Sequence, residues 1–240
     1  FYKFTLSDNS QAYAIGIKEA SMALAQESDS LSMQRSNLFQ QMTAVSDNEQ
    51  VVYASLNDSS AQNIPDTLSV KVDSLATGQT NVGNYLPSGE TSFPPGDYTF
   101  SISVGRNEYA FQLNVHKGDT NQQIQRNIAN SINEHNIGVR ANIRNQRVNG
   151  TSALVLRSEA VGLPQEGELF FHFNDTYLDN DISSALGVDQ VEIKPANAQF
   201  YINDSFHTSI SNRISLNQSM DLDLLSASSE PVNVHLVLDD

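Results

Sequence analysis

Two runs of alternating apolar and polar residues, separated by a short turn, place the strongest constraint on the fold of this chain. The first run is YTFSISV, the turn is GRNE and the second run is YAFQLNV, which together span residues 98–115. Because successive side chains of a strand point to opposite faces of a sheet, each run predicts a half-buried strand. The turn between them predicts an antiparallel hairpin. The residues expected on its buried face are Tyr98, Phe100, Ile102, Val104, Tyr109, Phe111, Leu113 and Val115.

One short helix is predicted directly after this hairpin. Thr120 and Gln123 stand in the register of a capping box, and Asn136 and Gly138 supply the stop signal. The apolar stripe of the helix consists of Ile124, Ile128, Ala129 and Ile132. Burying three Ile side chains contributes roughly 5–9 kcal/mol, whereas ordering about 16 residues costs about 1–2 kcal/mol each. The helix is therefore expected to pack on a sheet and to serve structure, not catalysis.

Further strands are expected on both sides of this unit. Alternation at Leu68, Val70 and Val72 predicts a strand, the Gly- and Pro-rich segment 77–97 predicts a long loop, and residues 51–56 suggest a further strand. After the helix, alternation resumes at Val139–Ile143 and in SALVLRS and ELFFHF, which gives a β-β-α-β-β-(β) unit with the helix on one sheet face. The closing segment from residue 196 is again β, with AQFYIND paired with SFHTSIS and clean alternation over 232–238.

The first forty residues differ in kind. Between Ser10 and Met42 there is no Pro, and an apolar residue recurs every seven positions, which predicts a long helix with an apolar seam. The seam, a candidate oligomer interface, consists of Ile17, Leu24, Leu31 and Leu38. Two interpretations are open: the seam packs on its own domain, or it binds a partner helix.

The predicted fold class is α+β. A long N-terminal helical stalk segment precedes antiparallel β-rich head modules with one short helix packed on a sheet. The expected divisions are a stalk over 1–65, a β-rich head over 66–188 with the helix at 120–136, and a second β module over 189–240, with the option that the last shares a sheet with 66–116.

Composition excludes several classes of function. The 28 acidic and 13 basic residues give a net charge of −15, which argues against nucleic acid or an anionic membrane as partner. The chain has no Cys, so disulfides, Cys-type zinc sites and thiol nucleophiles are excluded. No apolar run reaches the roughly 18–20 residues that span a bilayer, and the first residues lack a signal-peptide pattern.

The sequence predicts no catalytic residue, no metal site and no cofactor. None of the common nucleotide, hydrolase or metalloprotease motifs occurs, and the five His residues are scattered singly. The acidic loop with Asp175, Asp179 and Asp181 offers oxygen atoms for calcium, but its spacing is not that of a calcium loop, and a solvated loop is favoured. The helix also carries amides that could bind a glycan or a subunit or simply face solvent, namely Asn121, Gln122, Gln125 and Asn130.

Three segments, in order, resemble the flagellar filament cap proteins, also called hook-associated protein 2. LSVKVDSLATGQTNVG, over 68–83, is similar to a strand near the start of the family's head. The hairpin–helix–strand segment resembles a motif shared by flagellins and hook-associated proteins, through Thr120, Ile124, Ile132, Asn133, Leu154, Leu156, Ser158 and Gly162. The closing segment resembles the cap family through Ala196, Phe200, Asn203, Ser211, Asn212, Ile214, Leu222 and Leu224. Asp204 and Ser219 stand where the family tends to have glycine, so different turns are expected there.

The resemblance implies a non-enzymatic structural protein of the bacterial flagellum. Such a protein would be exported, self-assemble at the filament tip and guide flagellin into the filament, with itself and flagellin as partners and with an extracellular location. It also implies further helical segments that this sequence lacks. Two alternatives remain: a hook–filament junction protein of the same superfamily, or an adhesin or glycan-binding module on a helical stalk.

Overall fold

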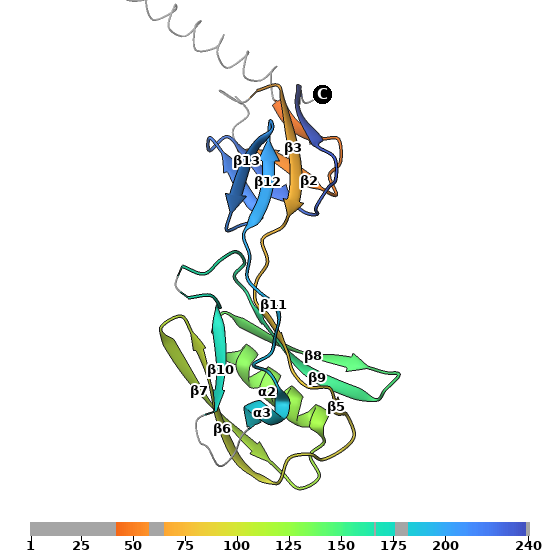
Figure 1. Ribbon diagram of the computed structural model, residues 1–240, viewed down its shortest axis with the longest axis vertical. Coiled ribbons are helices and arrows are strands. Elements are labelled where there is room, and N and C mark those ends of the chain that lie inside the picture. Colours follow the sequence, from red (N-terminus) through yellow and green to blue (C-terminus); the bar gives the residue numbers. More distant parts are fainter. Residues whose placement is uncertain (1–41, 58–64, 166, 176–181, 239–240) are drawn as a thin grey trace, which may run out of the picture.

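The computed structural model describes residues 42–57, 65–165, 167–175 and 182–238, with Asp175 described only in its backbone. They form two lobes joined at a narrow waist (Figure 1). The sandwich lobe comprises 42–57, 65–76 and 196–238, and the inserted lobe comprises the described residues of 77–195. The chain therefore leaves the sandwich lobe once, builds the inserted lobe and returns.

The sandwich lobe consists of two antiparallel sheets packed face to face. The first sheet has the order β1-β16-β3-β12-β13, from Met42–Ser46, Val232–Leu238, Thr67–Ser74, Ala198–Ile202 and Ser205–Ser209. The second has the order β14-β15-β2, from Arg213–Leu216, Met220–Leu224 and Val52–Leu56. Alternate residues of both sheets point between them and form one apolar core, which includes Val52, Val70, Phe200, Leu222 and Val234.

The inserted lobe has two smaller sheets. One has the order β10-β6-β7, from Phe171–Asp175, Gly96–Val104 and Asn107–Val115. The other has the order β11-β4-β9-β5, from Val191–Ile193, Thr80–Val82, Thr151–Ser158 and Leu86–Pro87, and β8, Val139–Gln146, pairs with β9. Two helices complete it, α2 at Asn121–His135 and α3 at Ile182–Leu186.

Helix α2 forms because its local signals agree. The Thr120 side chain accepts a hydrogen bond from the Gln123 backbone, and the Gln123 side chain accepts one from the Thr120 backbone, which confirms the predicted capping box. Asn136 ends the helix in the left-handed conformation at φ 48°. The stripe Ile124, Ile128 and Ile132 is fully buried, as the spacing of four residues predicts.

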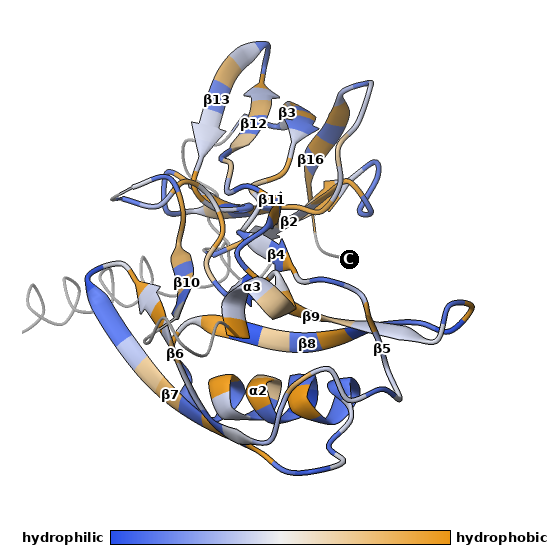
Figure 2. Ribbon diagram, turned by 60° about the horizontal axis from the view of Figure 1, so that its bottom comes forward, coloured by the Kyte–Doolittle hydropathy of each residue, from blue (hydrophilic) through white to orange (hydrophobic). Residues whose placement is uncertain are grey.

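The helix contacts strands of both sheets in its lobe. It packs mainly against β8 and β9, and it also contacts β7 from the other sheet. Figure 2 shows α2 alongside β8, with the β6–β7 hairpin curving around it. The strands of the predicted β-β-α-β-β-(β) unit thus belong to two sheets, and the helix lies in the core that these sheets share.

Both predicted hairpins form, and the turn of the first is shorter than the predicted GRNE. In β6–β7, Val104 is paired with Asn107 and Phe100 with Phe111, around a turn at Gly105 and Arg106. In β12–β13, Ile202 is paired with Ser205. The β12–β13 turn consists of Asn203 and Asp204, at φ 47° and 65°, so Asn and Asp fill the left-handed positions that glycine would favour. At the β14–β15 turn these positions are Asn217 and Gln218, not Ser219.

Segment 77–97 differs from the predicted long loop. It contains the short strands β4 and β5, and Gln79, Thr80 and Asn81 are buried in it. The prediction of a loop from the Gly and Pro content was wrong, because β4 and β5 are stabilised by pairing with β9, which is distant in the sequence.

The helical seam Ile17, Leu24, Leu31 and Leu38 lies outside the described residues. The division at residues 65 and 188 stays a prediction about folding units; among the described strands, β3 pairs with β12 and β16.

Candidate functional site

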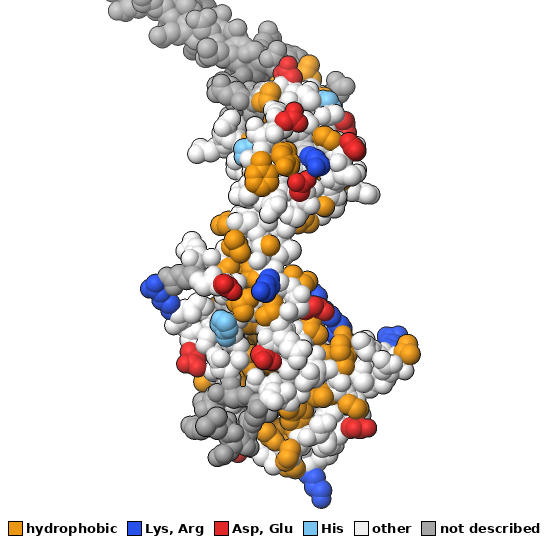
Figure 3. All heavy atoms as spheres, viewed as in Figure 1, with side chains coloured by type: hydrophobic (Ala, Val, Ile, Leu, Met, Phe, Trp, Pro, Cys, Tyr) orange, Lys and Arg blue, Asp and Glu red, His pale blue; other side chains and the backbone are white. Residues whose placement is uncertain are grey.

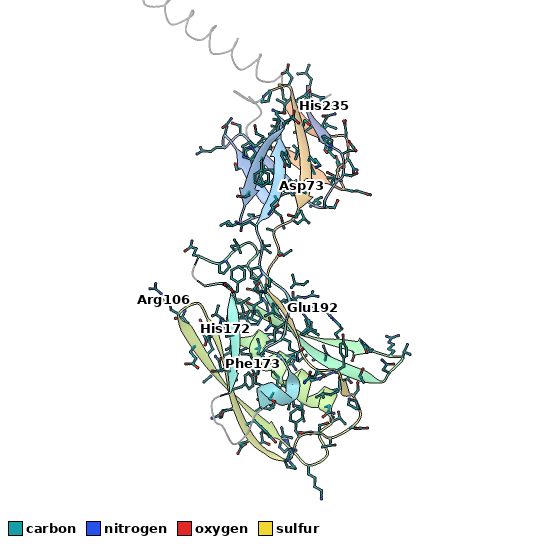
Figure 4. All side chains as sticks on the ribbon, viewed as in Figure 1. Asp73, Arg106, His172, Phe173, Glu192 and His235 are labelled. Carbon is teal, nitrogen blue, oxygen red and sulfur yellow. The ribbon has the colours of Figure 1, made fainter. Side chains whose placement is uncertain are left out.

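The histidines, the usual candidates for proton transfer, lie on separate elements. His116 follows β7, with its Nδ1 atom 3.5 Å from an Asp119 carboxylate oxygen. His135 is the last residue of α2, and its ring forms a T-shaped pair with Phe111. His172 is exposed on β10, as Figure 4 shows. His207 stacks on Phe200, and His235 bonds Thr67 and lies near Asp47. Within the described ranges, no group of three His, Asp or Glu residues is arranged to hold a metal ion.

The acidic loop cannot be assembled into a site from the described residues. Asp175 is described only in its backbone, as the last residue of β10, and Asp179 and Asp181 lie outside the described residues. The interpretation of this loop as a solvated segment therefore stays a prediction. In the described part of the chain, neither helix is long and apolar enough to cross a bilayer.

The prediction for the helix amides is wrong at two of four positions, because Asn121 and Gln125 are fully buried. Asn121 donates to the Pro87 carbonyl at 2.9 Å and to Ser92 Oγ at 2.8 Å, and its Oδ1 accepts from the Ser92 backbone at 2.9 Å. Gln125 donates to the Ser152 carbonyl at 2.9 Å. These amides attach α2 to the surrounding loop and to β9. Most buried polar groups in proteins are bonded, and here the amide N–H bonds position the helix, whereas Gln125 Oε1 and Ser152 Oγ are buried without a hydrogen-bond partner among the described residues.

Another buried amide side chain, that of Gln79, connects the two sheets of the inserted lobe. Gln79 is the residue before β4. Its side chain donates to the Phe171 carbonyl at 2.9 Å and accepts from the Phe171 backbone N–H at 3.0 Å. Its Nε2 also donates to Asn81 Oδ1 at 2.8 Å. The Gln79 side chain thus reproduces, between β4 and β10, the pair of bonds that a neighbouring strand would make. Sequence reasoning missed this residue because it lies in the segment predicted as loop.

The waist is the place where the two lobes are fixed to each other. Thr77 and Ala196 form an isolated antiparallel bridge, and the Thr77 carbonyl also accepts from Gly162 N–H at 3.0 Å. The Asn197 side chain accepts from the Leu163 backbone N–H at 2.8 Å. Gly162 has φ +81°, and a Cβ atom there would clash with the carbonyl oxygen of Ile210 in the sandwich lobe. The glycine of the sequence motif therefore permits close contact between the lobes.

On the sandwich side, Asn212 holds the strand that enters the waist. Its Oδ1 accepts from the Ala76 backbone N–H at 2.6 Å, and its Nδ2 donates to the Ala76 carbonyl at 3.0 Å. Asn212 is a residue of the closing segment that resembles the cap family, and it too positions the chain. Gly162 and Asn212, from two different segments of the resemblance, thus bond to consecutive residues at the waist, Thr77 and Ala76.

Charged side chains on the β8–β9 hairpin form a small network. Arg144 binds both carboxylate oxygens of Glu192, at 2.8 and 3.0 Å, and hydrogen bonding from Arg144 lowers the pKa of Glu192. Arg140 pairs with Glu159. Figure 4 shows Glu192 on the side of the lobe that carries this hairpin.

The outer face of the sandwich lobe carries an aromatic pair of half-buried Tyr201 and exposed Phe206. Tyr201 and Phe206 lie with their ring centroids 5.4 Å apart, and Phe206 is 53% exposed. Beside them is a pocket of about 240 Å³, lined by Tyr201, Pro231, Asp204, Lys71 and Ser69. Figure 3 shows hydrophobic side chains next to acidic and basic ones on this face.

Comparison with known proteins gives a consistent result at the level of fold. No model of a protein family matches the sequence, and no curated protein matches it. Solved structures do match. The flagellar cap protein FliD D2–D3 domains from Escherichia coli superpose with a TM-score of 0.59 at 19% identity, over 83% of this chain and 100% of that one.

Two further structures agree. The FliD D1–D2–D3 domains from E. coli give a TM-score of 0.58 at 21% identity over 85% of this chain, which spans 61% of that structure's length. FliD from Bdellovibrio bacteriovorus gives 0.55 at 16% identity, over 80% of this chain and 99% of that one. The chain therefore has a FliD-like flagellar cap fold, which includes both lobes.

Proposed function

We propose that this chain belongs to a structural protein of the bacterial flagellum that caps the filament. In this proposal it is exported, self-assembles at the filament tip and templates the insertion of flagellin, with no cofactor and no catalytic step. The observation that carries the proposal is the likeness to FliD structures from several bacteria, which extends over 83% of the chain and all of the E. coli D2–D3 domains.

The arrangement of the two lobes supports a structural role, in which the protein acts by holding its parts in position. Both lobes have complete cores, and the waist attaches one to the other through backbone and amide bonds. A cap must hold its parts at fixed positions around a filament tip, and such a waist serves that need. The seam Ile17, Leu24, Leu31 and Leu38 would add a helical stalk that joins copies or binds further helices of the longer protein.

The test is deletion of the gene that encodes this chain, followed by complementation. We expect the deletion strain to secrete flagellin as monomer and to build few filaments, and the unmodified gene to restore filament length. A gene with Leu24→Ser and Leu31→Ser should not restore it, whereas the control changes Gln26→Ser and Gln40→Ser, which lie off the seam, should. Normal filaments in the deletion strain would refute the cap proposal, and a loss of surface attachment in that strain would favour the adhesin alternative.

A further inference from the structure

The β8–β9 hairpin carries an unusual concentration of positive charge for so acidic a chain. Residues 139–158 contain four of the 13 Lys and Arg residues and no Asp or Glu. Arg140 and Arg157 stand directly opposite each other in the β8–β9 register. Like charges in facing positions destabilise a hairpin. The stability of the hairpin alone therefore gives no reason for this arrangement.

Intrachain partners neutralise only part of this charge. Glu159 and Glu192 pair with Arg140 and Arg144, whereas Arg147 and Arg157 are exposed and make no salt bridge with a described residue. Arg157 still adds to the lowering of the Glu192 pKa that Arg144 chiefly causes. The hairpin projects sideways from the inserted lobe (Figure 1). At its tip Val148 is 99% exposed. The tip thus presents an arginine next to an apolar side chain.

The sandwich lobe has the opposite character. Its described residues include eight acidic side chains and two basic ones, and both basic residues pair with Asp of the same lobe, as Lys71 with Asp73 and Arg213 with Asp221. In this lobe Asp204 and Glu230 are exposed and make no salt bridge with a described residue, although Glu230 adds to the rise in the pKa of Lys71 that Asp73 chiefly causes. Asp204 lines the pocket beside the Tyr201–Phe206 pair, and Glu230 precedes Pro231, which also lines it.

We infer that the tip of the β8–β9 hairpin docks in the Tyr201–Pro231 pocket of a second copy of this chain, with Val148 in the pocket and Arg147 against Asp204 and Glu230. This inference rests on the proposed function, because it names the contact through which copies associate. A pocket of about 240 Å³ has room for a valine side chain, and Tyr201 and Pro231 supply the apolar part of its lining. Lys71 also lines the pocket, with its Nζ atom 5.5 Å from the centre of the Tyr201 ring.

A second copy fits better than another occupant because of the charges of the whole chain. Copies with a net charge of −15 repel each other. Association therefore requires a contact that places the positive element of one copy on the negative surface of the next. The two surfaces lie on different lobes, so the contact is head to tail, and repetition of such a contact closes a ring when the rotation permits.

Charge reversal tests the contact in the full-length protein by sedimentation velocity. Arg147→Glu and Asp204→Arg should each weaken self-association by about tenfold or more, and the combination of the two should restore most of it. Arg106→Glu is the matched control, because Arg106 occupies the turn of the other hairpin of the lobe, β6–β7. Figure 4 shows Arg106 at the left of the inserted lobe, opposite the side from which the β8–β9 hairpin projects. This control should leave association unchanged, and salt near 1 M should weaken the unmodified contact.

Cysteine cross-linking tests the geometry, since the chain has no native Cys. A protein with Val148→Cys and Phe206→Cys should form a ladder of covalent oligomers on oxidation, whereas either single change should give dimers at most. Association that survives Arg147→Glu and gives no ladder would overturn the hairpin contact and leave the cap proposal intact. Absence of any association of the unmodified protein would overturn the contact too, while the filament phenotype would still decide the cap proposal separately.

Discussion

The two lobes bury polar groups to very different extents. Among the described residues of the sandwich lobe, Ser46 is the one buried polar side chain, whereas the inserted lobe buries Gln79, Thr80, Asn81, Ser101, Asn121, Gln125 and Ser152. The sandwich lobe is closed by regular strand ladders around an apolar core. Among the described strands, no ladder joins the two sheets of the inserted lobe, and they are connected instead by the Gln79 side chain and by packing around helix α2.

The difference shows two ways to fix one arrangement of sheets. In the sandwich lobe, side-chain packing between pleated faces determines the arrangement. In the inserted lobe, apolar packing around α2 supplies stability, and buried amides determine which backbone groups meet. A buried amide that lost its partner would cost free energy without a compensating bond to water, so alternative placements of the sheets are disfavoured.

The largest effects are expected from cavities in the two cores. Ile128→Ala should lower the free energy of unfolding of the inserted lobe by about 2–5 kcal/mol, and Phe200→Ala should lower that of the sandwich lobe by about 3–5 kcal/mol. Because the lobes have separate cores, each change should shift only the unfolding transition of its own lobe. Hydrogen exchange measures the protection of backbone amides in each lobe separately. Each variant serves as the control for the other.

Equal loss of protection in both lobes after either change would contradict the expectation that the two lobes unfold separately. It would mean that the waist couples the lobes into one cooperative unit, and the discontinuous sandwich lobe would then depend on the lobe inserted into it.

A smaller effect is expected from the buried amide face. Gln125→Ala should cost about 1–3 kcal/mol, because it leaves the Ser152 carbonyl without its bond in a buried place. Asn130→Ala is the control on the exposed side of the same helix and should be nearly neutral. Chemical denaturation of both variants gives the comparison. A neutral Gln125→Ala would show that packing alone positions α2.

Local patterns predicted those elements whose signals are local. The β6–β7 hairpin, α2 with its capping box and the β12–β13 hairpin each depend on residues within about twenty positions, and the structure has them as expected. The resemblance to cap proteins, carried by ordered but individually weak motifs, agrees with the fold of the similar structures.

Features that depend on distant residues were not predictable. β4 and β5 exist because β9 pairs with them, and Gln79 is buried because β10 lies opposite it. The helix amides gave a polar pattern that is equally compatible with exposure and with burial against bonding partners. Gly162 and Asn212 were identified as motif residues, yet only the fold shows that both serve the waist.

We expect the waist to hold the two lobes in one arrangement. The direct measurement is the distance between spin labels on Glu49→Cys in the sandwich lobe and Gln112→Cys in the inserted lobe, by pulsed electron paramagnetic resonance in an excess of unlabelled protein. One narrow distance distribution is expected, and Gly162→Ala should shift or broaden it because the added Cβ clashes with the Ile210 backbone. A broad distribution in the protein with native Gly162 would contradict the claim.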